Sequence, residues 1–190
     1  MNTPLERLIS RPWFWVVLVG AIATFPIVKA MRTPLPPKLP VLGAFPDFQL
    51  TDEQGQPFGS DLLRGRAWIA DFFAVGCADD CQRLVGKFGQ VQHRTRNLGP
   101  AFHRVSFSVA SDAPALLADY AKAHRASPRM WSFVSGAPAG FVDAHPQVAD
   151  GHFAVLVDAQ MHIRAFYDMA APDVVDALLF DVGMLLNRPE

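Results

Sequence analysis

The sequence predicts an α/β domain with a mixed central sheet flanked by helices, preceded by an N-terminal transmembrane helix. Apolar runs typical of strands alternate with segments of helical periodicity from residue 41 onward. Two cysteines stand where a buried strand is followed by a helix, and a short hairpin precedes the last helix. These three observations together indicate a thioredoxin-like fold.

Length and composition exclude several classes of protein. The 190 residues suffice for one domain of ordinary size plus a tail. Lys and Arg number 17 and Asp and Glu 18, so the net charge of -1 gives no electrostatic reason to expect nucleic-acid binding. Two cysteines are too few for a disulfide-stapled miniprotein or a four-thiolate zinc site.

The N-terminal segment is strongly apolar. Residues 12–28 read PWFWVVLVGAIATFPIV and carry no charge. The length of this segment is close to that of the shortest helix able to span a bilayer. Trp13 and Trp15 lie at one end, where amphipathic rings favour a membrane interface. We therefore expect a membrane anchor over residues 1–32, with a cleaved signal peptide and a buried core helix as alternatives. Basic residues flank both ends, so the positive-inside rule does not decide the orientation.

A proline-rich spacer follows. Residues 33–40 read TPLPPKLP, and four prolines in eight residues favour extended polyproline II structure. The remaining residues, 41–190, are predicted to form one thioredoxin-like domain with a single sizeable core.

The first elements of this domain are a short strand over 47–50 and a turn signal at 52–55. The run 67–74, AWIADFFA, is mostly apolar, rich in aromatic residues and followed closely by Gly76, so it predicts a buried strand. Helical spacing of four apolar residues predicts the next helix: Leu84, Val85, Phe88 and Val91. Alternation over 103–109 predicts a second central strand.

The second half continues the pattern. A helix is expected over 114–125, with Ser111 or Asp112 as its cap. Apolar runs at 153–157 and 163–167 are separated by a short connection and predict a hairpin. Pro172 is expected to open the last helix, whose apolar residues recur with a period near 3.6.

Cys77 and Cys81 are the most informative feature of the sequence. Backbone N–H groups at a helix N-terminus favour thiolate over thiol, and a thiolate is both a nucleophile and a ligand for soft metals. Four-residue spacing on a helix sets Cβ atoms about 5–6 Å apart, whereas a disulfide needs about 3.5–4.5 Å. The loop must therefore tighten to form a disulfide, while a bridging metal tolerates the wider gap. The alternative is a pair of small, buried, inert thiols.

Copper(I) prefers thiolate and imidazole ligands, so two cysteines and one histidine would form a chemically sensible site. Among the six histidines, His152 is the best candidate, because it precedes the strand 153–157 in a loop-like segment able to approach the cysteines. Asp79 and Asp80 supply hard oxygen atoms, which suit a soft metal poorly.

Other short motifs surround the Cys77-x-x-x-Cys81 spacing. They are Pro46-Asp47-Phe48, Leu50-Thr51-Asp52, Phe72-Phe73, Ser106-Phe107-Ser108-Val109 and Leu156-Val157-Asp158. With the apolar N-terminus and the spacer, the pattern resembles the Sco/SenC family of membrane-anchored, thioredoxin-fold copper proteins, which assist assembly of the dinuclear copper centre of cytochrome c oxidase.

The resemblance implies that Cys77 and Cys81 bind a copper ion and cycle to a disulfide. From its position in the sequence, His152 is the residue that we expect as the third copper ligand. It implies a partner that is the copper-bearing subunit of cytochrome c oxidase or another copper or thiol protein. It also implies a place in the inner membrane, with the domain on the periplasmic side. Two departures stand out: Ala78 replaces the usual proline, and His152 lies six residues before Asp158 rather than eight.

Three functions stay open at this point. The first is a Sco-like copper chaperone. The second is a metal-independent, membrane-anchored thiol-disulfide oxidoreductase, in which Cys77 attacks a partner disulfide and Cys81 resolves the mixed disulfide. The third is a docking module with inert cysteines.

Overall fold

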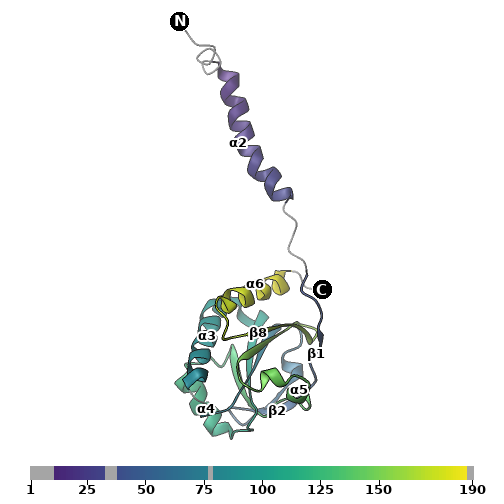
Figure 1. Ribbon diagram of the computed structural model, residues 1–190, viewed down its shortest axis with the longest axis vertical. Helices are drawn as coiled ribbons and strands as arrows, with labels where there is room; N and C mark the ends of the chain where they lie inside the picture. The colour runs from purple at the N-terminus through teal and green to yellow at the C-terminus, as the bar shows by residue number, and fades with distance from the viewer. Residues whose placement is uncertain (1–10, 33–37, 77–78, 188–190) are drawn as a thin grey trace. The chain divides into compact units, whose positions relative to one another are not determined.

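The computed structural model describes residues 11–32, 38–76 and 79–187. The chain divides into two units, Met1–Lys38 and Leu39–Glu190, which are described separately. Figure 1 shows the elements of both units and their labels.

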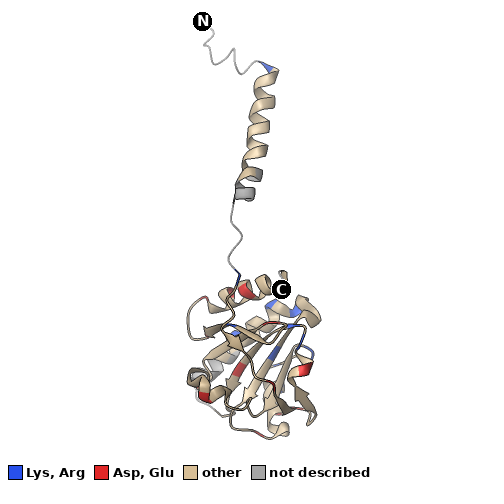
Figure 2. Cartoon of the chain, turned by 90° about the vertical axis from the view of Figure 1, so that its right-hand side faces the viewer, with Lys and Arg blue, Asp and Glu red and all other residues tan. Residues whose placement is uncertain are grey.

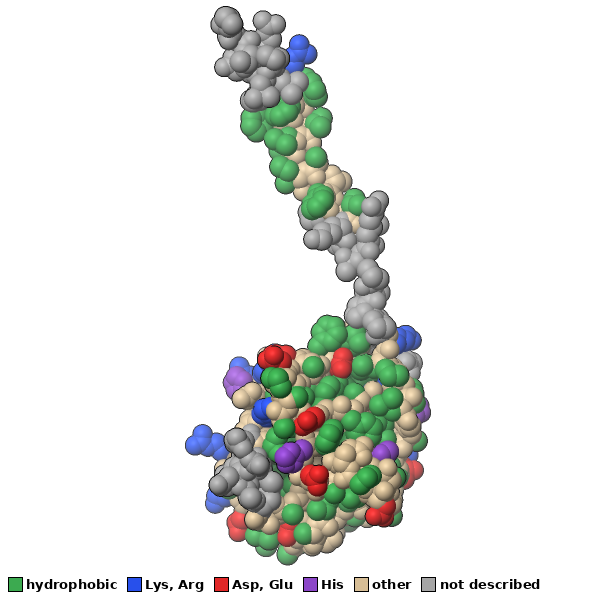
Figure 3. All heavy atoms as spheres, in the orientation of Figure 1, with side chains coloured by type: hydrophobic (Ala, Val, Ile, Leu, Met, Phe, Trp, Pro, Cys, Tyr) green, Lys and Arg blue, Asp and Glu red, His purple; other side chains and the backbone are tan. Residues whose placement is uncertain are grey.

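The described part of the first unit is helix α2, Pro12–Arg32. Its apolar side chains are largely exposed, among them Val16 at 73% and Phe25 at 71% (Figure 3). The helix expected over residues 12–28 is thus present. The transmembrane span expected there is not found: none of the helices described here has the length and apolar character that a membrane crossing requires.

The second unit is built on one eight-stranded mixed sheet with the order β1-β8-β7-β4-β5-β6-β2-β3. Strands β4, β5 and β6 are parallel, whereas every other neighbouring pair is antiparallel. The strands are β1 Gly43–Ala44, β2 Gln49–Asp52, β3 Pro57–Gly59, β4 Ala67–Phe73, β5 Phe102–Ser108, β6 Trp131–Ser135, β7 Phe153–Val157 and β8 His162–Asp168.

Helices cover both faces of this sheet. The α-helices are α3 Asp79–Thr95, α4 Pro114–Ala123, α5 Phe141–Ala144 and α6 Val174–Asn187, and the 3-10 turns are η1 Ser60–Leu62, η2 Arg96–Ala101 and η3 Pro146–Val148. Apolar residues of α3, α4 and α6 pack in one core, and Phe141 of α5 packs in the other (Figure 1). The architecture confirms the mixed sheet flanked by helices that the sequence predicts.

Strand β4 lies in the middle of the sheet and is buried on both faces. Successive side chains of a strand point to opposite faces. Ile69 accordingly lies in the core beneath α3, α4 and α6, and Trp68 and Phe72 lie in the opposite core. This double burial explains why the segment reads as a continuous apolar run.

Several expectations need correction. The strand expected over 47–50 is β2, Gln49–Asp52, and α6 begins at Val174 rather than at Pro172. Strands β1, β3 and β6 are not predicted. The cap of α4 is Ala113, which makes no side-chain hydrogen bond to the helix. Asp112 does not cap the helix, since its carboxylate accepts hydrogen bonds from Ser108 Oγ at 2.7 Å and Val75 N–H at 3.3 Å.

Candidate functional site

The predicted cysteine pair follows the carboxyl end of β4. Cys77 lies outside the described residues, and so does the side chain of Cys81. Strand β4 ends at Phe73 and helix α3 begins at Asp79, with Cys81 as its third residue. The strand and the helix expected on either side of the pair are therefore confirmed, while the roles of the two thiols stay predictions.

His152 lies at the same edge of the sheet. Strands β4 and β7 are antiparallel with Asp71 opposite Ala154, so continuing this register by two residues sets His152 level with Phe73. The residue is half-buried, and its carbonyl accepts a hydrogen bond from Met169 N–H at 2.7 Å. The fold thus brings position 152 to the end of the strand that leads to the cysteines.

Gly151 explains how this loop comes so close to β4. Its φ is +72°, and an added Cβ would lie 3.1 Å from the carbonyl oxygen of Phe72. Only glycine adopts this backbone conformation without strain and leaves room for the strand. Among the described residues no group of three or more His, Cys, Asp or Glu is arranged to hold a metal. Cys77 and the side chain of Cys81 are not among them, so the copper ligand set stays a prediction.

The loop after β5 is tied to the segment that leads to Cys77. Asp112 accepts the Val75 N–H, and its own N–H donates to Ser108 Oγ at 3.2 Å. A neighbouring residue, Ser111, has φ +54°, which turns the chain sharply beside Gly136. Asp112 therefore links the ends of β4 and β5 at the predicted site.

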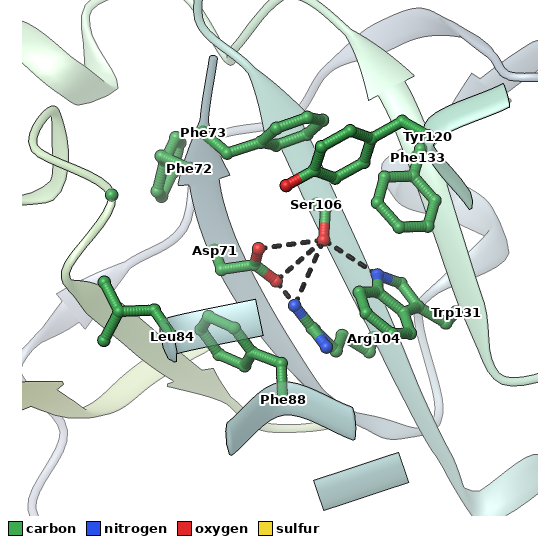
Figure 4. A pocket seen from close by; sticks show the side chains of 11 residues that line it. Asp71, Phe72, Phe73, Leu84, Phe88, Arg104, Ser106, Tyr120, Trp131 and Phe133 are labelled. Atoms are coloured by element: carbon green, nitrogen blue, oxygen red, sulfur yellow. Dashed lines mark hydrogen bonds and ion pairs between the residues drawn. The ribbon is translucent and has the colours of Figure 1, made fainter. Parts of the chain in front are cut away.

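A buried polar cluster lies beneath this edge: Asp71, Arg104, Ser106 and Trp131 (Figure 4). Arg104 Nε donates to Asp71 Oδ1 at 2.8 Å, and both side chains are at most 5% exposed. Ser106 Oγ donates to the same carboxylate and accepts the indole N–H of Trp131 at 2.8 Å. Figure 2 shows acidic and basic positions within the central strands, which are otherwise mostly uncharged.

Arg104 is also held between two aromatic rings. Its guanidinium carbon lies 3.8 Å from the ring centre of Phe88 on α3 and 3.6 Å from that of Trp131 on β6. Burial lowers the pKa of Arg104, and the nearby Asp71 carboxylate opposes this shift. The Nη1 atom is buried without a hydrogen-bond acceptor. The flat cation thus fills the space between helix α3 and the sheet.

The cluster borders a small pocket whose walls come from β4, β5, β6, α3 and α4. Leu84, Phe88 and Tyr120 line it from the helices, and Gly151 lines it from the loop beside His152. The Tyr120 hydroxyl points toward Asp71 in Figure 4, and burial followed by the charge of Asp71 raises the pKa of Tyr120. The pocket is therefore lined by the buried ion pair, by helix α3 after the cysteines and by the loop that carries His152.

The sequence prediction did not identify this cluster. The available signal was a charged residue inside each of two apolar strands, Asp71 in AWIADFFA and Arg104 in FHRVSFS. Buried charges are rare unless they are paired. The two residues could therefore have been proposed as partners.

A comparison with protein families covers the strand and the helix on either side of the predicted cysteine pair. The family model described as SCO1/SenC matches residues 43–147, more than half of the 190 residues. No curated protein sequence matches the chain significantly.

Solved structures share the fold. A SCO1/SenC family lipoprotein from Bacillus anthracis has a TM-score of 0.67 at 20% identity, covering 77% of this chain and 96% of its own. BsSco, described as a Sco-family cytochrome c oxidase assembly protein with a disulfide switch, has a TM-score of 0.68 at 19% identity, covering 80% and 99%. Yeast Sco1 with copper bound has a TM-score of 0.58 at 23% identity, covering 76% and 94%.

Proposed function

The chain belongs to the SCO1/SenC family, and on that premise we propose that it binds copper(I) through Cys77 and Cys81 and delivers it to a copper centre of cytochrome c oxidase. The observation that carries the proposal is the position of His152. This residue precedes β7 and lies level with the end of β4, where the segment that leads to the cysteines begins. That yeast Sco1 and Bradyrhizobium japonicum ScoI were solved with copper bound supports the choice of metal.

The donor atoms suit this cargo. Thiolate sulfur and imidazole nitrogen both bind copper(I) well, and the carboxylates near the site do not compete for it. The hydrogen bond from Met169 N–H engages the backbone carbonyl of His152 and not its imidazole ring. In the proposed transfer, cysteines of the acceptor replace the donor thiolates one at a time, so copper is never released to water.

Copper titration of the reduced full chain tests this proposal. We expect one copper(I) per chain, loss of binding in Cys77→Ser and Cys81→Ser, and affinity about tenfold or more weaker in His152→Ala. The matched control is His145→Ala, since His145 is also half-buried but packs on Phe141 and Phe166. A reduced chain that ignores copper(I) contradicts the proposal, and equal losses in both histidine variants contradict the role of His152.

A second candidate is a metal-independent thiol-disulfide oxidoreductase, favoured by the disulfide switch described for BsSco. The Cys77 thiolate would attack a partner disulfide and release one partner thiolate. Cys81 would then attack the mixed disulfide, releasing the second thiolate and leaving this chain oxidised by two electrons. Reduction of a model disulfide by His152→Ala at the wild-type rate, in a chain that binds no copper, would favour this candidate.

We propose that the chain resides at the inner membrane, with its domain on the periplasmic side and α2 as the attachment. The exposed apolar side chains of α2 support this location, because water solvates such a surface poorly. Fractionation of the full chain and of a chain lacking residues 1–38 tests it. Recovery of both in the soluble fraction would contradict the attachment, and protection of the domain from external protease in spheroplasts would contradict the periplasmic side.

A further inference from the structure

Helix α3 presents one stripe of residues to the pocket. Leu84 and Phe88, 6% and 3% exposed, line the pocket from this helix. An α-helix turns 100° per residue, so position 81 lies within about 20° of position 88 and 60° of position 84 around the axis. The stripe that packs on the pocket therefore begins at the position of Cys81.

Several polar contacts join α3 to the rest of the domain. Near its C-terminal end, Gln92 bonds to the backbone of Arg125 and Ser127, and Arg94 pairs with Asp176 on α6. Lys87 Nζ donates to the carbonyl oxygens of Met169 and Ala171 at 2.6 and 2.8 Å, which ties the helix to the loop before α6. A further contact is the Arg104 guanidinium against the ring of Phe88. Among the polar contacts of the described side chains of α3, the one with Arg104 joins the helix to the parallel strands beneath the predicted site.

Arg104 is itself fixed in place. Asp71 holds its Nε, Ser106 lies 3.4 Å from its Nη2, and Trp131 covers the face opposite Phe88. A planar guanidinium can stack on two rings while donating in its own plane, and a lysine ammonium cannot. The position of Phe88, and with it the start of α3, thus depends on the shape of Arg104 as well as on its charge.

We propose that Arg104 is a positioning residue for the cysteine pair. Through its contact with Phe88, it fixes the position of helix α3 on the sheet. The proposal rests on the proposed function, in which Cys77 and Cys81 carry the chemistry. Arg104 itself contacts neither copper nor a partner; it acts through the helix.

The test compares Arg104→Lys with Arg164→Lys in the full chain. Arg164 forms the matched buried pair, since its Nη1 donates to Asp158 at 3.0 Å and both side chains are at most 6% exposed. Asp158 lies directly after β7, at the end of that strand remote from His152. Both variants keep a positive charge and lose the planar fork, so both are expected to lower the stability of the domain.

Two readouts separate positioning from stability. In the Cys77→Ser background, we expect Arg104→Lys to raise the rate at which the Cys81 thiol is alkylated by about fivefold or more, and Arg164→Lys to change it less than twofold. In the chain with both cysteines, Arg104→Lys should weaken copper(I) binding by about tenfold. Equal rates for the two variants overturn the proposal, even if both are destabilised.

A second variant covers the case in which Arg104→Lys does not fold. Phe88→Leu preserves the Asp71–Arg104 ion pair and an apolar core while removing the stacked ring, and the same rise in alkylation rate is expected. An unchanged rate overturns the proposal. The alkylation measurement needs no metal. A wild-type chain that fails to bind copper(I) would contradict the proposed function, whereas the role of Arg104 is decided by the alkylation rates alone.

Discussion

Asp71 and Arg104 lie on neighbouring parallel strands, and their side chains form an ion pair of 2.8 Å inside the domain. Asp71 is opposite Ser106, so Arg104 is displaced by two residues and shares the same face of the sheet. The pair is thus a diagonal contact that exists only when β4 and β5 are in this register.

Removal of one member of this pair should be more damaging than removal of both. Asp71→Ala leaves a buried guanidinium charge without compensation, and we expect a loss of about 3–5 kcal/mol in the free energy of unfolding. The double variant Asp71→Leu/Arg104→Met removes both charges and should lose less. Denaturant unfolding measures both, and equal losses would show that the single variant does not suffer from an unpaired charge.

Adjacent leucines on α4 offer a matched test of packing. Leu117 is fully buried, whereas Leu116 is 44% exposed. Leu117→Ala should lower the free energy of unfolding by about 2–5 kcal/mol, because it leaves a cavity in the core beneath α4. Leu116→Ala should change it by about 0.5 kcal/mol or less. Similar losses from the two variants would contradict the burial described here.

Gly151 should tolerate substitution less well than Gly55. Both have positive φ, +72° and +77°, but a Cβ at Gly55 meets nothing within 4 Å, while one at Gly151 meets the Phe72 carbonyl at 3.1 Å. We expect a loss of about 1–2 kcal/mol for Gly55→Ala from backbone strain alone, and a larger one for Gly151→Ala. If thermal or denaturant unfolding gives equal losses, the loop before β7 does not press on β4.

The stability of the domain should fall as the pH is lowered below about 6.5. Burial, with the nearby charge of Arg66, lowers the pKa of His103 to about 4. Between pH 6.5 and 4 the unfolded chain therefore binds more protons at this residue than the folded chain. This contribution to stability is complete above the unfolded pKa and is lost as the pH falls toward 4, by about 3 kcal/mol in total.

Unfolding measured from pH 7 to pH 4 checks this contribution. His103→Gln retains a hydrogen-bonding partner for Ser132, which lies 3.0 Å from the imidazole, and should flatten the pH dependence. His93→Gln is the control, because His93 is exposed on α3. If the free energy of unfolding of His103→Gln changes with pH as it does in the wild type, groups other than His103 cause the pH dependence.

The sequence predicts most of this fold because burial leaves a clear pattern. Strand β7 is predicted at its observed bounds, 153–157, since both of its faces are buried and its residues are uniformly apolar. Strand β6 is missed because it has only five residues, WSFVS, too few to establish an alternating pattern. Ser132 is buried against His103, a partner 29 positions earlier that periodicity within the segment does not show.

The site is predictable in part for the same reason. The strand before the cysteines and the helix after them follow from local pattern, and the position of His152 follows from its place before β7. The ion pair of Asp71 and Arg104 does not, because 33 residues separate its members and only the register of β4 and β5 brings them together. Side chains that meet across a sheet depend on register, which the composition of one strand does not encode.

The strand order also has a consequence for how the protein is made. Strand β4 pairs with β7, so the ribosome must add the residues from Cys81 to Val157 before the sheet can close on that side. At about 5–20 residues per second, this interval is roughly 4–15 s. For most of this interval both cysteines have been synthesised, whereas His152 and strand β7 have not. The central strand β4 therefore gains its antiparallel neighbour only after both cysteines and the whole of α3, β5 and β6 have been made.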